Sequence, residues 1–272
     1  MRSTLLLFIL LISADSVTYA ADASAYEEGL TGRLARSYIN GESVWISLDE
    51  RPFLGLYRRS TSLGPSRAAL ILHSMGAHAD WPDVISPLRT YLPGKGWSTL
   101  SIQLPVLAPQ TSLSDYGASF RQSALRLRAS IKYLQDQGHA NIVLLGYSFG
   151  ASTAIDYLAS DSSGVRGLAG ISMQEFPFLN PPFRLVEQLE KTNVPVLDVY
   201  GSRDYSDVLR SVDDRRLAAS KGGNRAYQQQ IIKDADHYFS SKQGELVDRI
   251  VEWLDTIVPG YLRRDTDPFY LL

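Results

Sequence analysis

The chain contains the residue types that turn a serine hydroxyl into a nucleophile, in the order serine, aspartate, histidine. Ser148 lies at the centre of the run Gly146-Tyr-Ser-Phe-Gly150, after the apolar segment 142–145 and before residues that favour a helix. A serine hydroxyl is a weak nucleophile near neutral pH, so it needs an imidazole that takes its proton and a carboxylate that orients the imidazole. The two glycines leave room for the sharp turn that would expose the hydroxyl. The alternative is an ordinary turn serine.

The candidate acid and base each follow a strand-like segment. Asp204 ends a turn after the apolar segment 194–200, and His237 comes shortly after the segment 227–232. Ligands of open α/β sheets bind where parallel strands end, so we expect both side chains at the same edge as Ser148. The alternative role for Asp204 is to cap the following helix.

The other three histidines have plainer explanations. His139 lies in a turn, where we expect a solvated side chain, and His73 ends a core strand, where we expect a hydrogen-bonded structural role. His73, His78 and Asp80 resemble a metal cluster, but their spacing fits no single helix or strand face. We therefore expect no metal and no cofactor.

Asp198 interrupts the apolar segment 194–200. A carboxylate buried there would need donors or a cation. The alternative is that it faces outward at a sheet edge or orders a neighbouring loop. Its position several residues before the strand end argues against a role as the acid of the triad.

Short apolar segments alternate with helical patterns, which indicates an α/β fold. The segments 43–48 and 53–57 predict an antiparallel start. Later strand candidates are largely apolar: 68–72, 99–102, 142–145, 167–171 and 194–200. Apolar residues recur at helical spacing over 120–134 and 246–257. This alternation is typical of right-handed crossovers and of a mainly parallel sheet with helices on both faces.

Length and composition indicate one globular domain. The chain has 272 residues, 44% of them hydrophobic, and a net charge of −2. Such a balanced charge favours neither nucleic acid nor an anionic membrane surface as a partner. The absence of cysteine excludes disulfides, a thiol nucleophile and cysteine-ligated zinc. The sequence does not indicate the oligomeric state.

Residues 1–20 are typical of a secretory signal peptide. Arg2 supplies the positive charge, 5–12 form an apolar stretch, and small residues precede a cleavage point after Ala20. The apolar stretch is shorter than the roughly 20 residues that span a bilayer, so no membrane segment is expected after cleavage. We predict a periplasmic protein; the alternative is an uncleaved N-terminal anchor.

Residues 68–258 resemble an α/β-hydrolase core, with Gly-Tyr-Ser-Phe-Gly as the nucleophile turn, Gly-Ser-Arg-Asp as the acid turn and Asp-His-Tyr-Phe as the histidine loop. The stretches His73-Ser-Met-Gly76 and Ser101-Ile-Gln-Leu-Pro105 are similar to those of a bacterial family of exported α/β-hydrolase-like proteins of unknown function. On this reading a signal over 1–20 and antiparallel strands within 21–67 precede the core, and a tail, 259–272, follows it.

The resemblance also implies an oxyanion hole, formed by the backbone N–H groups of Phe149 and Met75. Ser74 stands where such proteins usually have glycine, so it would narrow the pocket or add a hydroxyl donor.

Glu175 is the reserve acid, because some members of the fold place the carboxylate after the strand that corresponds to the segment 167–171. A serine nucleophile argues against the members that use a carboxylate instead.

These residues predict a serine hydrolase, a small carboxylesterase that forms an acyl-enzyme with a small-molecule acyl substrate. Leu104 and Phe176 lie in the two loops expected to frame the site, so they would contact an apolar acyl group, or else pack those loops onto the domain. The alternative function is that of a non-catalytic scaffold, a binding or envelope-assembly protein that keeps the fold without turnover.

Overall fold

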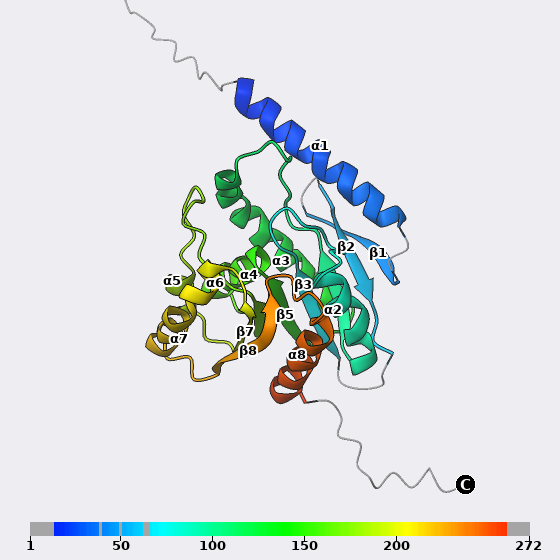
Figure 1. Cartoon of the computed structure of the whole chain (residues 1–272). Coiled ribbons are helices and arrows are strands. Elements are labelled where there is room, and N and C mark those ends of the chain that lie inside the picture. The colour runs from blue at the N-terminus through cyan, green and yellow to red at the C-terminus, as the bar shows by residue number, and fades with distance from the viewer. Residues whose placement is uncertain (1–13, 38–39, 49–50, 62–65, 260–272) are drawn as a thin grey trace, which may run out of the picture.

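The computed structural model describes residues 14–37, 40–48, 51–61 and 66–259 (Figure 1). Residues 1–13 of the expected signal peptide and almost all of the expected tail lie outside the described residues. Within the described part, no helix is both long and apolar enough to cross a membrane.

A single mixed sheet forms the centre of the molecule. Its order is β1-β2-β4-β3-β5-β6-β7-β8. The pairs β1–β2 and β2–β4 are antiparallel, and all neighbours from β4 to β8 are parallel. The strands are β1 (Glu42–Ile46), β2 (Phe53–Arg58), β3 (Arg67–Leu72), β4 (Ser98–Ile102), β5 (Asn141–Tyr147), β6 (Val165–Ile171), β7 (Val196–Arg203) and β8 (Tyr227–Asp236).

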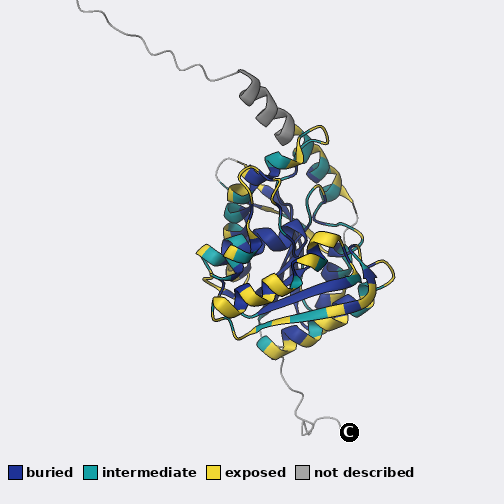
Figure 2. Cartoon of the chain, turned by 60° about the vertical axis from the view of Figure 1, so that its left-hand side comes forward, coloured by how far each residue is buried: buried dark blue, intermediate teal, exposed yellow. Residues whose placement is uncertain are grey.

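Helices cover both faces of this sheet, as the buried strands at the centre of Figure 2 indicate. Side chains alternate along β3, so Leu70 joins the cluster under α3, α4, α5 and α7, whereas Ile71 joins the cluster under α2 and α8. The helices are α1 (Ala14–Arg36), α2 (Ile85–Tyr91), α3 (Ser119–Asp136), α4 (Phe149–Ser160), α5 (Leu185–Leu189), α6 (Ser206–Arg210), α7 (Val212–Lys221) and α8 (Gln243–Ile257), with the short 3-10 helices η1 (Leu92–Lys95) and η2 (Leu113–Ala118).

The fold agrees with the sequence prediction of an α/β architecture. The two early segments form the antiparallel strands β1 and β2, and the helical patterns over 120–134 and 246–257 fall within α3 and α8. Because β2 pairs with β4, the N-terminal strands extend the same sheet as the later ones. The antiparallel start and the mainly parallel sheet are therefore confirmed.

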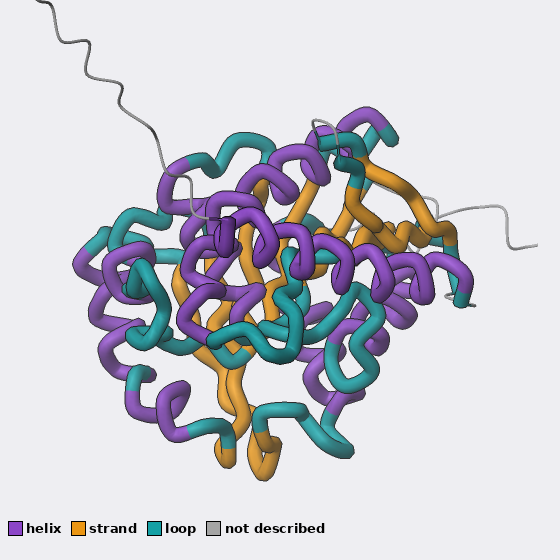
Figure 3. Tube along the Cα trace, turned by 90° about the horizontal axis from the view of Figure 1, so that it is seen from above, coloured by secondary structure: helices purple, strands orange, loops and turns teal. Residues whose placement is uncertain are grey.

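Helix α1 is an element that the sequence pattern did not indicate. It lies across one end of the body of the molecule (Figures 1 and 3). Glu27 fixes it there: its carboxylate pairs with Arg126 Nη1 at 2.6 Å and accepts the N–H of Val106 at 3.3 Å. Since Glu27 follows the expected cleavage point after Ala20, this contact would remain in a processed chain.

Asp198 is fully buried in β7 and paired with Arg215 of α7. The Arg215 Nε donates to one carboxylate oxygen at 2.7 Å, and Tyr227 and Gln229 of β8 donate to the same oxygen at 2.6 and 3.0 Å. The outward-facing alternative is wrong, because donors and a cation surround the carboxylate. Asp198 joins α7 to the last two strands.

His139 also differs from the prediction of a solvated side chain. It is buried beneath β2, where its Nε2 lies 3.0 Å from the Tyr57 hydroxyl and its Nδ1 lies 3.3 Å from Ser66 Oγ. Its turn packs onto the sheet, so the polar ring finds protein partners instead of water.

Candidate active site

A polar residue follows each parallel strand of the sheet, and all of these residues lie at the same edge. In sheet order from β4 to β8, the first residues after the strands are Gln103, His73, Ser148, Ser172, Asp204 and His237. All six are buried. The topology therefore places the predicted nucleophile, acid and base in one row, with Ser172 between the nucleophile and the acid.

Ser148 occupies a strained turn between β5 and α4. Its φ of 52° and ψ of −114° lie outside the regions that a serine ordinarily adopts. Close backbone approaches require glycine on both sides: a Cβ on Gly146 would lie 2.5 Å from Ala151 Cα, and one on Gly150 would lie 2.3 Å from the Leu72 carbonyl oxygen. The two glycines thus permit the elbow that holds Ser148 at the sheet edge.

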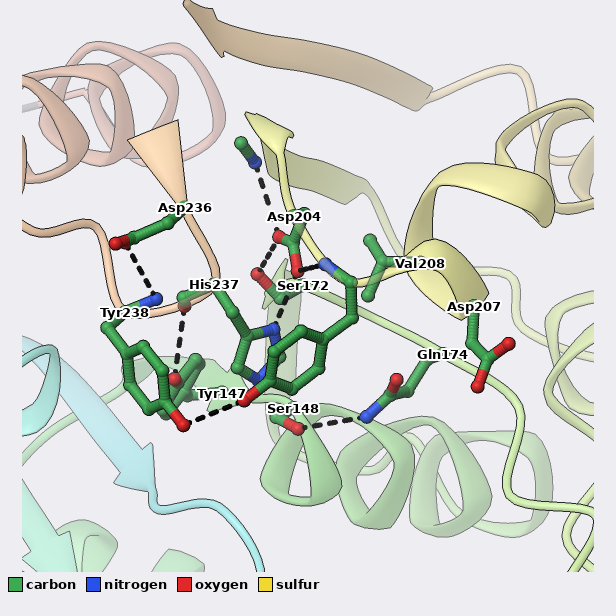
Figure 4. Close-up of polar contacts among 12 residues, drawn as sticks. Tyr147, Ser148, Ser172, Gln174, Asp204, Asp207, Val208, Asp236, His237 and Tyr238 are labelled. Atoms are coloured by element: carbon green, nitrogen blue, oxygen red, sulfur yellow. Dashed lines mark hydrogen bonds and ion pairs between the residues drawn. The ribbon is translucent and has the colours of Figure 1, made fainter. Parts of the chain in front are cut away.

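Asp204 and His237 are joined directly. His237 Nδ1 lies 2.6 Å from Asp204 Oδ1, and both side chains are almost completely buried. The imidazole therefore presents its other nitrogen, Nε2, away from the acid. In Figure 4 the Ser148 hydroxyl lies on that opposite side of the ring. Tyr147 fixes the histidine loop, because its hydroxyl donates to the His237 carbonyl oxygen at 3.1 Å.

Asp204 is held as a carboxylate by several donors. Ser172 Oγ donates to its Oδ2 at 2.5 Å, and the N–H of Tyr205 donates to its Oδ1 at 2.7 Å. Burial opposes ionisation, but the hydrogen bonds from His237 and Ser172 outweigh it, so the pKa of Asp204 lies below its ordinary value of 3.8. The acid is thus ionised at neutral pH and oriented toward the imidazole.

Ser148 Oγ accepts a hydrogen bond of 3.4 Å from Gln174 Nε2. In the described chain no hydrogen bond joins Ser148 to His237, although the two side chains face each other (Figure 4). Catalytic hydrogen bonds are often long before a substrate binds and shorten in the complex.

The loop after β3 carries the expected second oxyanion donor, Met75. His73 anchors this loop: its Nδ1 lies 2.8 Å from the Ser74 carbonyl oxygen, and its Nε2 lies 3.0 Å from the N–H of Leu104, which can only donate to it. Burial lowers the pKa of His73 to about 3, so the ring is neutral at physiological pH. His73 therefore has the structural role that its position predicted.

The two expected oxyanion donors belong to different elements: Phe149 to the first turn of α4, and Met75 to the loop after β3. Neither N–H donates to a backbone carbonyl within the described residues. The Phe149 side chain is buried and packs edge-on against Tyr116 and Phe120. Ser74 and Met75 are partly exposed, so this part of the loop can meet a substrate.

Glu175, the reserve acid, is engaged elsewhere. Its two carboxylate oxygens accept the N–H groups of Leu185 and Val186 at 2.9 and 3.2 Å, at the beginning of α5. It thus serves as the cap of a short helix, while Asp204 contacts the imidazole.

The two apolar residues expected to contact substrate are buried instead. Leu104 has no exposed surface, and Phe176 retains 5%. Both belong to the apolar cluster that also contains Phe149. The structure therefore favours the alternative that they pack their loops onto the domain.

Three side chains at this site were absent from the sequence prediction: Ser172, Gln174 and Tyr205. Ser172 follows the predicted strand 167–171, so its position at the strand end was a usable signal. Gln174 and Tyr205 reach the site through loop conformation, which no local pattern in the sequence encodes.

Solved structures share this fold. Est1E from Butyrivibrio proteoclasticus has a TM-score of 0.65 at 13% identity, covering 79% of this chain and 98% of that one. Dienelactone hydrolase from Anabaena variabilis has 0.64 at 19% identity, covering 79% and 96%. An esterase from Pyrococcus furiosus has 0.64 at 16% identity, covering 80% and 92%. No curated protein matches by sequence. At these identities the likeness establishes the fold.

The sequence family is identified separately. A family model described as "Protein of unknown function (DUF3530)" matches residues 18–124 and 108–256. These ranges include every strand of the sheet and the row of polar residues at its edge. The match confirms the predicted resemblance to a family of unknown function, and the structural neighbours confirm the predicted α/β-hydrolase fold. The chain therefore belongs to the DUF3530 family and has the α/β-hydrolase fold.

Proposed function

We propose that this protein is a serine hydrolase that cleaves an ester-like acyl bond through an acyl-enzyme intermediate. The observation that carries the proposal is the 2.6 Å contact between Asp204 and His237, with Ser148 at a strained turn beside the imidazole. The names of two structural neighbours, an esterase and a dienelactone hydrolase, support the same class of reaction.

In the proposed reaction the Ser148 oxygen attacks the acyl carbonyl carbon while His237 Nε2 takes the hydroxyl proton. Asp204 holds the imidazole in the required tautomer and stabilises its positive charge. The N–H groups of Phe149 and Met75 stabilise the negative oxygen of the tetrahedral intermediate; loss of one such donor typically costs about 3 kcal/mol. His237 then protonates the leaving alcohol, and water, activated by the same imidazole, releases the acid.

A small acyl substrate fits this proposal better than a large lipid. The segment from Gln174 to Lys191 contains only the five-residue helix α5, which is short for a lid over an extended chain. With Leu104 and Phe176 buried, the partly exposed Ser74 and Met75 are the better candidates for contact with the acyl group.

Turnover of p-nitrophenyl esters of graded acyl length tests the proposed function. We expect hydrolysis of short acyl esters by the purified protein, and loss of activity in both Ser148→Ala and His237→Ala. A folded wild-type protein that hydrolyses none of these esters would instead favour the non-catalytic scaffold.

A further inference from the structure

Three tyrosine rings enclose the imidazole of His237. Tyr147 lies beneath it, with ring centroids 5.3 Å apart and a tilt of 38°. Tyr205 stacks on the ring at 3.9 Å and 11°, and Tyr238 meets its edge at 5.7 Å and 88°. Only Tyr147 is buried; Tyr205 and Tyr238 keep 45% and 42% of their surface exposed. The His237 side chain is only 6% exposed, because the rings around it shield it from water.

The two exposed tyrosines also hold each other. Their hydroxyl oxygens are 2.7 Å apart, and their rings meet at 88°. Each backbone is tied to a carboxylate: the Tyr205 N–H donates to Asp204, and the Tyr238 N–H donates to Asp236 at 3.1 Å. The pair therefore bridges the loop after β7 to the loop after β8, directly over the imidazole.

The hydrogen bond to Asp204 holds one corner of the imidazole at Nδ1 but does not by itself fix the plane of the ring, since the ring can still tilt about the line from Nδ1 to Asp204 Oδ1. A flat ring stacked at 3.9 Å removes that freedom. The face of a tyrosine ring also attracts a cation that lies within about 6 Å of its centre. Tyr205 thus favours the orientation that the proposed reaction requires of His237, and its face is placed to attract the imidazolium that forms during that reaction.

We propose that Tyr205 is a positioning residue for His237, and that Tyr238 holds Tyr205 in place through the paired hydroxyls. The inference rests on the proposed hydrolase function, in which His237 must direct Nε2 at Ser148. The π face of Tyr205 orients the imidazole, and the hydroxyl group has the lesser role of holding the Tyr205 ring in place.

Substitutions at Tyr205 separate these contributions. Tyr205→Leu covers the imidazole with an apolar side chain but has no π face, whereas Tyr205→Phe keeps the face and loses only the hydroxyl. We expect Tyr205→Leu to lower kcat about tenfold with KM changed less than about threefold. The single substitutions Tyr205→Phe and Tyr238→Phe remove one hydroxyl each and keep the stacked ring, so each variant should keep a kcat within about threefold of wild type. Tyr91→Leu, at a residue of α2 that is 65% exposed, is the matched control and should behave as wild type.

Two kinetic outcomes would overturn the inference: equal activity in Tyr205→Leu and wild type, or a loss confined to KM, which would make Tyr205 a substrate contact. A loss in Tyr205→Phe as large as in Tyr205→Leu would equally refute a role for the π face. Circular dichroism melting checks that each variant is folded.

A second measurement does not depend on turnover. The Nδ1–H proton of His237 should give a low-field NMR signal because it is shared with Asp204 at 2.6 Å. We expect this signal to broaden in Tyr205→Leu, where the imidazole is freer to tilt, and to persist in Tyr205→Phe. A signal equally sharp in both variants would refute the positioning role. If the wild type hydrolyses no ester while the signal still responds in this way, the proposed function is wrong, but the positioning of His237 by Tyr205 and Tyr238 is supported.

Discussion

The acid at this site is defined by its contacts more than by its sequence position. Asp204 receives hydrogen bonds from Ser172 and from the Tyr205 N–H and contacts His237, whereas Glu175 caps α5. Both carboxylates follow strands of the same sheet, so position alone does not separate them. The direct contact with the imidazole supports the orienting role that we propose for Asp204.

Conservative amide substitutions distinguish these two carboxylates in solution. We expect Asp204→Asn to reduce kcat by about 10³- to 10⁴-fold, because an amide favours the wrong imidazole tautomer. Glu175→Gln should remain close to wild type in kcat, since the hydrogen bonds that Glu175 makes within the described residues go to backbone N–H groups at the beginning of α5. Steady-state ester hydrolysis measures both. A large loss in Glu175→Gln with near-normal Asp204→Asn would reverse the assignment.

The lowered pKa of Asp204 also predicts a dependence of stability on pH. The pKa of Asp204 is lower in the folded state than its ordinary value of 3.8, which applies to the unfolded chain. At pH values above 3.8 the ionised carboxylate therefore stabilises the fold, and this contribution is lost as the pH falls through the pKa of the folded state. The difference in free energy of unfolding between wild type and Asp204→Asn should therefore be largest near pH 6 and shrink below pH 4. Urea unfolding at several pH values measures it. A difference that stays constant down to pH 2 would contradict the ionised, hydrogen-bonded state of Asp204.

For individual residues, the sequence predicted which side chains lie at strand ends better than it predicted which side chains contact one another. Asp204 and His237 could be expected near Ser148 because each follows a strand-like segment. The stacking of Tyr205 on His237 depends on how two loops meet across β7 and β8, and no local pattern encodes that. His139 shows the opposite error, since a turn position suggested solvent while packing against Tyr57 buries it.

Among the elements, α7 is attached to the sheet by a buried charge. Arg215 and Asp198 are both inaccessible to water, and Arg215 Nη1 also donates to the Val208 carbonyl oxygen at 2.8 Å. The sequence pattern marked Asp198 as unusual in an apolar strand. It could not identify Arg215 as the partner, because Arg215 lies 17 residues later on a helix with a weak apolar pattern.

Removal of Arg215 should therefore be severely destabilising. Arg215→Ala leaves a buried carboxylate without its cation, which typically costs about 3–5 kcal/mol of the free energy of unfolding. Lys132→Ala is the matched control, because Lys132 pairs with Asp136 on the exposed surface of α3 and should lose no more than about 0.5 kcal/mol. Chemical unfolding of the two variants tests the contrast. Similar small losses would show that the buried pair contributes little.

For the molecule as a whole, alternation of apolar strands and amphipathic helices was enough to predict the fold class. Right-handed crossovers and coverage of both faces follow from that alternation, and the structural neighbours share the result. Helix α1 escaped prediction because its position depends on the pair of Glu27 and Arg126, which are 99 residues apart.

Export remains a prediction at this scale. If residues 1–20 are a signal peptide, the protein recovered from the periplasm of a bacterial host should begin at residue 21 and retain Glu27 on the body. Intact mass spectrometry of that fraction measures the N-terminus. A full-length mass in the membrane fraction would support the uncleaved anchor instead.

The central claim is that Ser148 is a nucleophile activated by His237 and Asp204. The most direct test is reaction of the purified protein with a fluorophosphonate, followed by intact mass spectrometry and peptide mapping. We predict a single phosphonyl adduct on Ser148 in the wild type, no adduct in Ser148→Ala, and a much slower reaction in His237→Ala. A folded wild-type protein that remains unmodified, or one that is modified equally in Ser148→Ala, would contradict the claim.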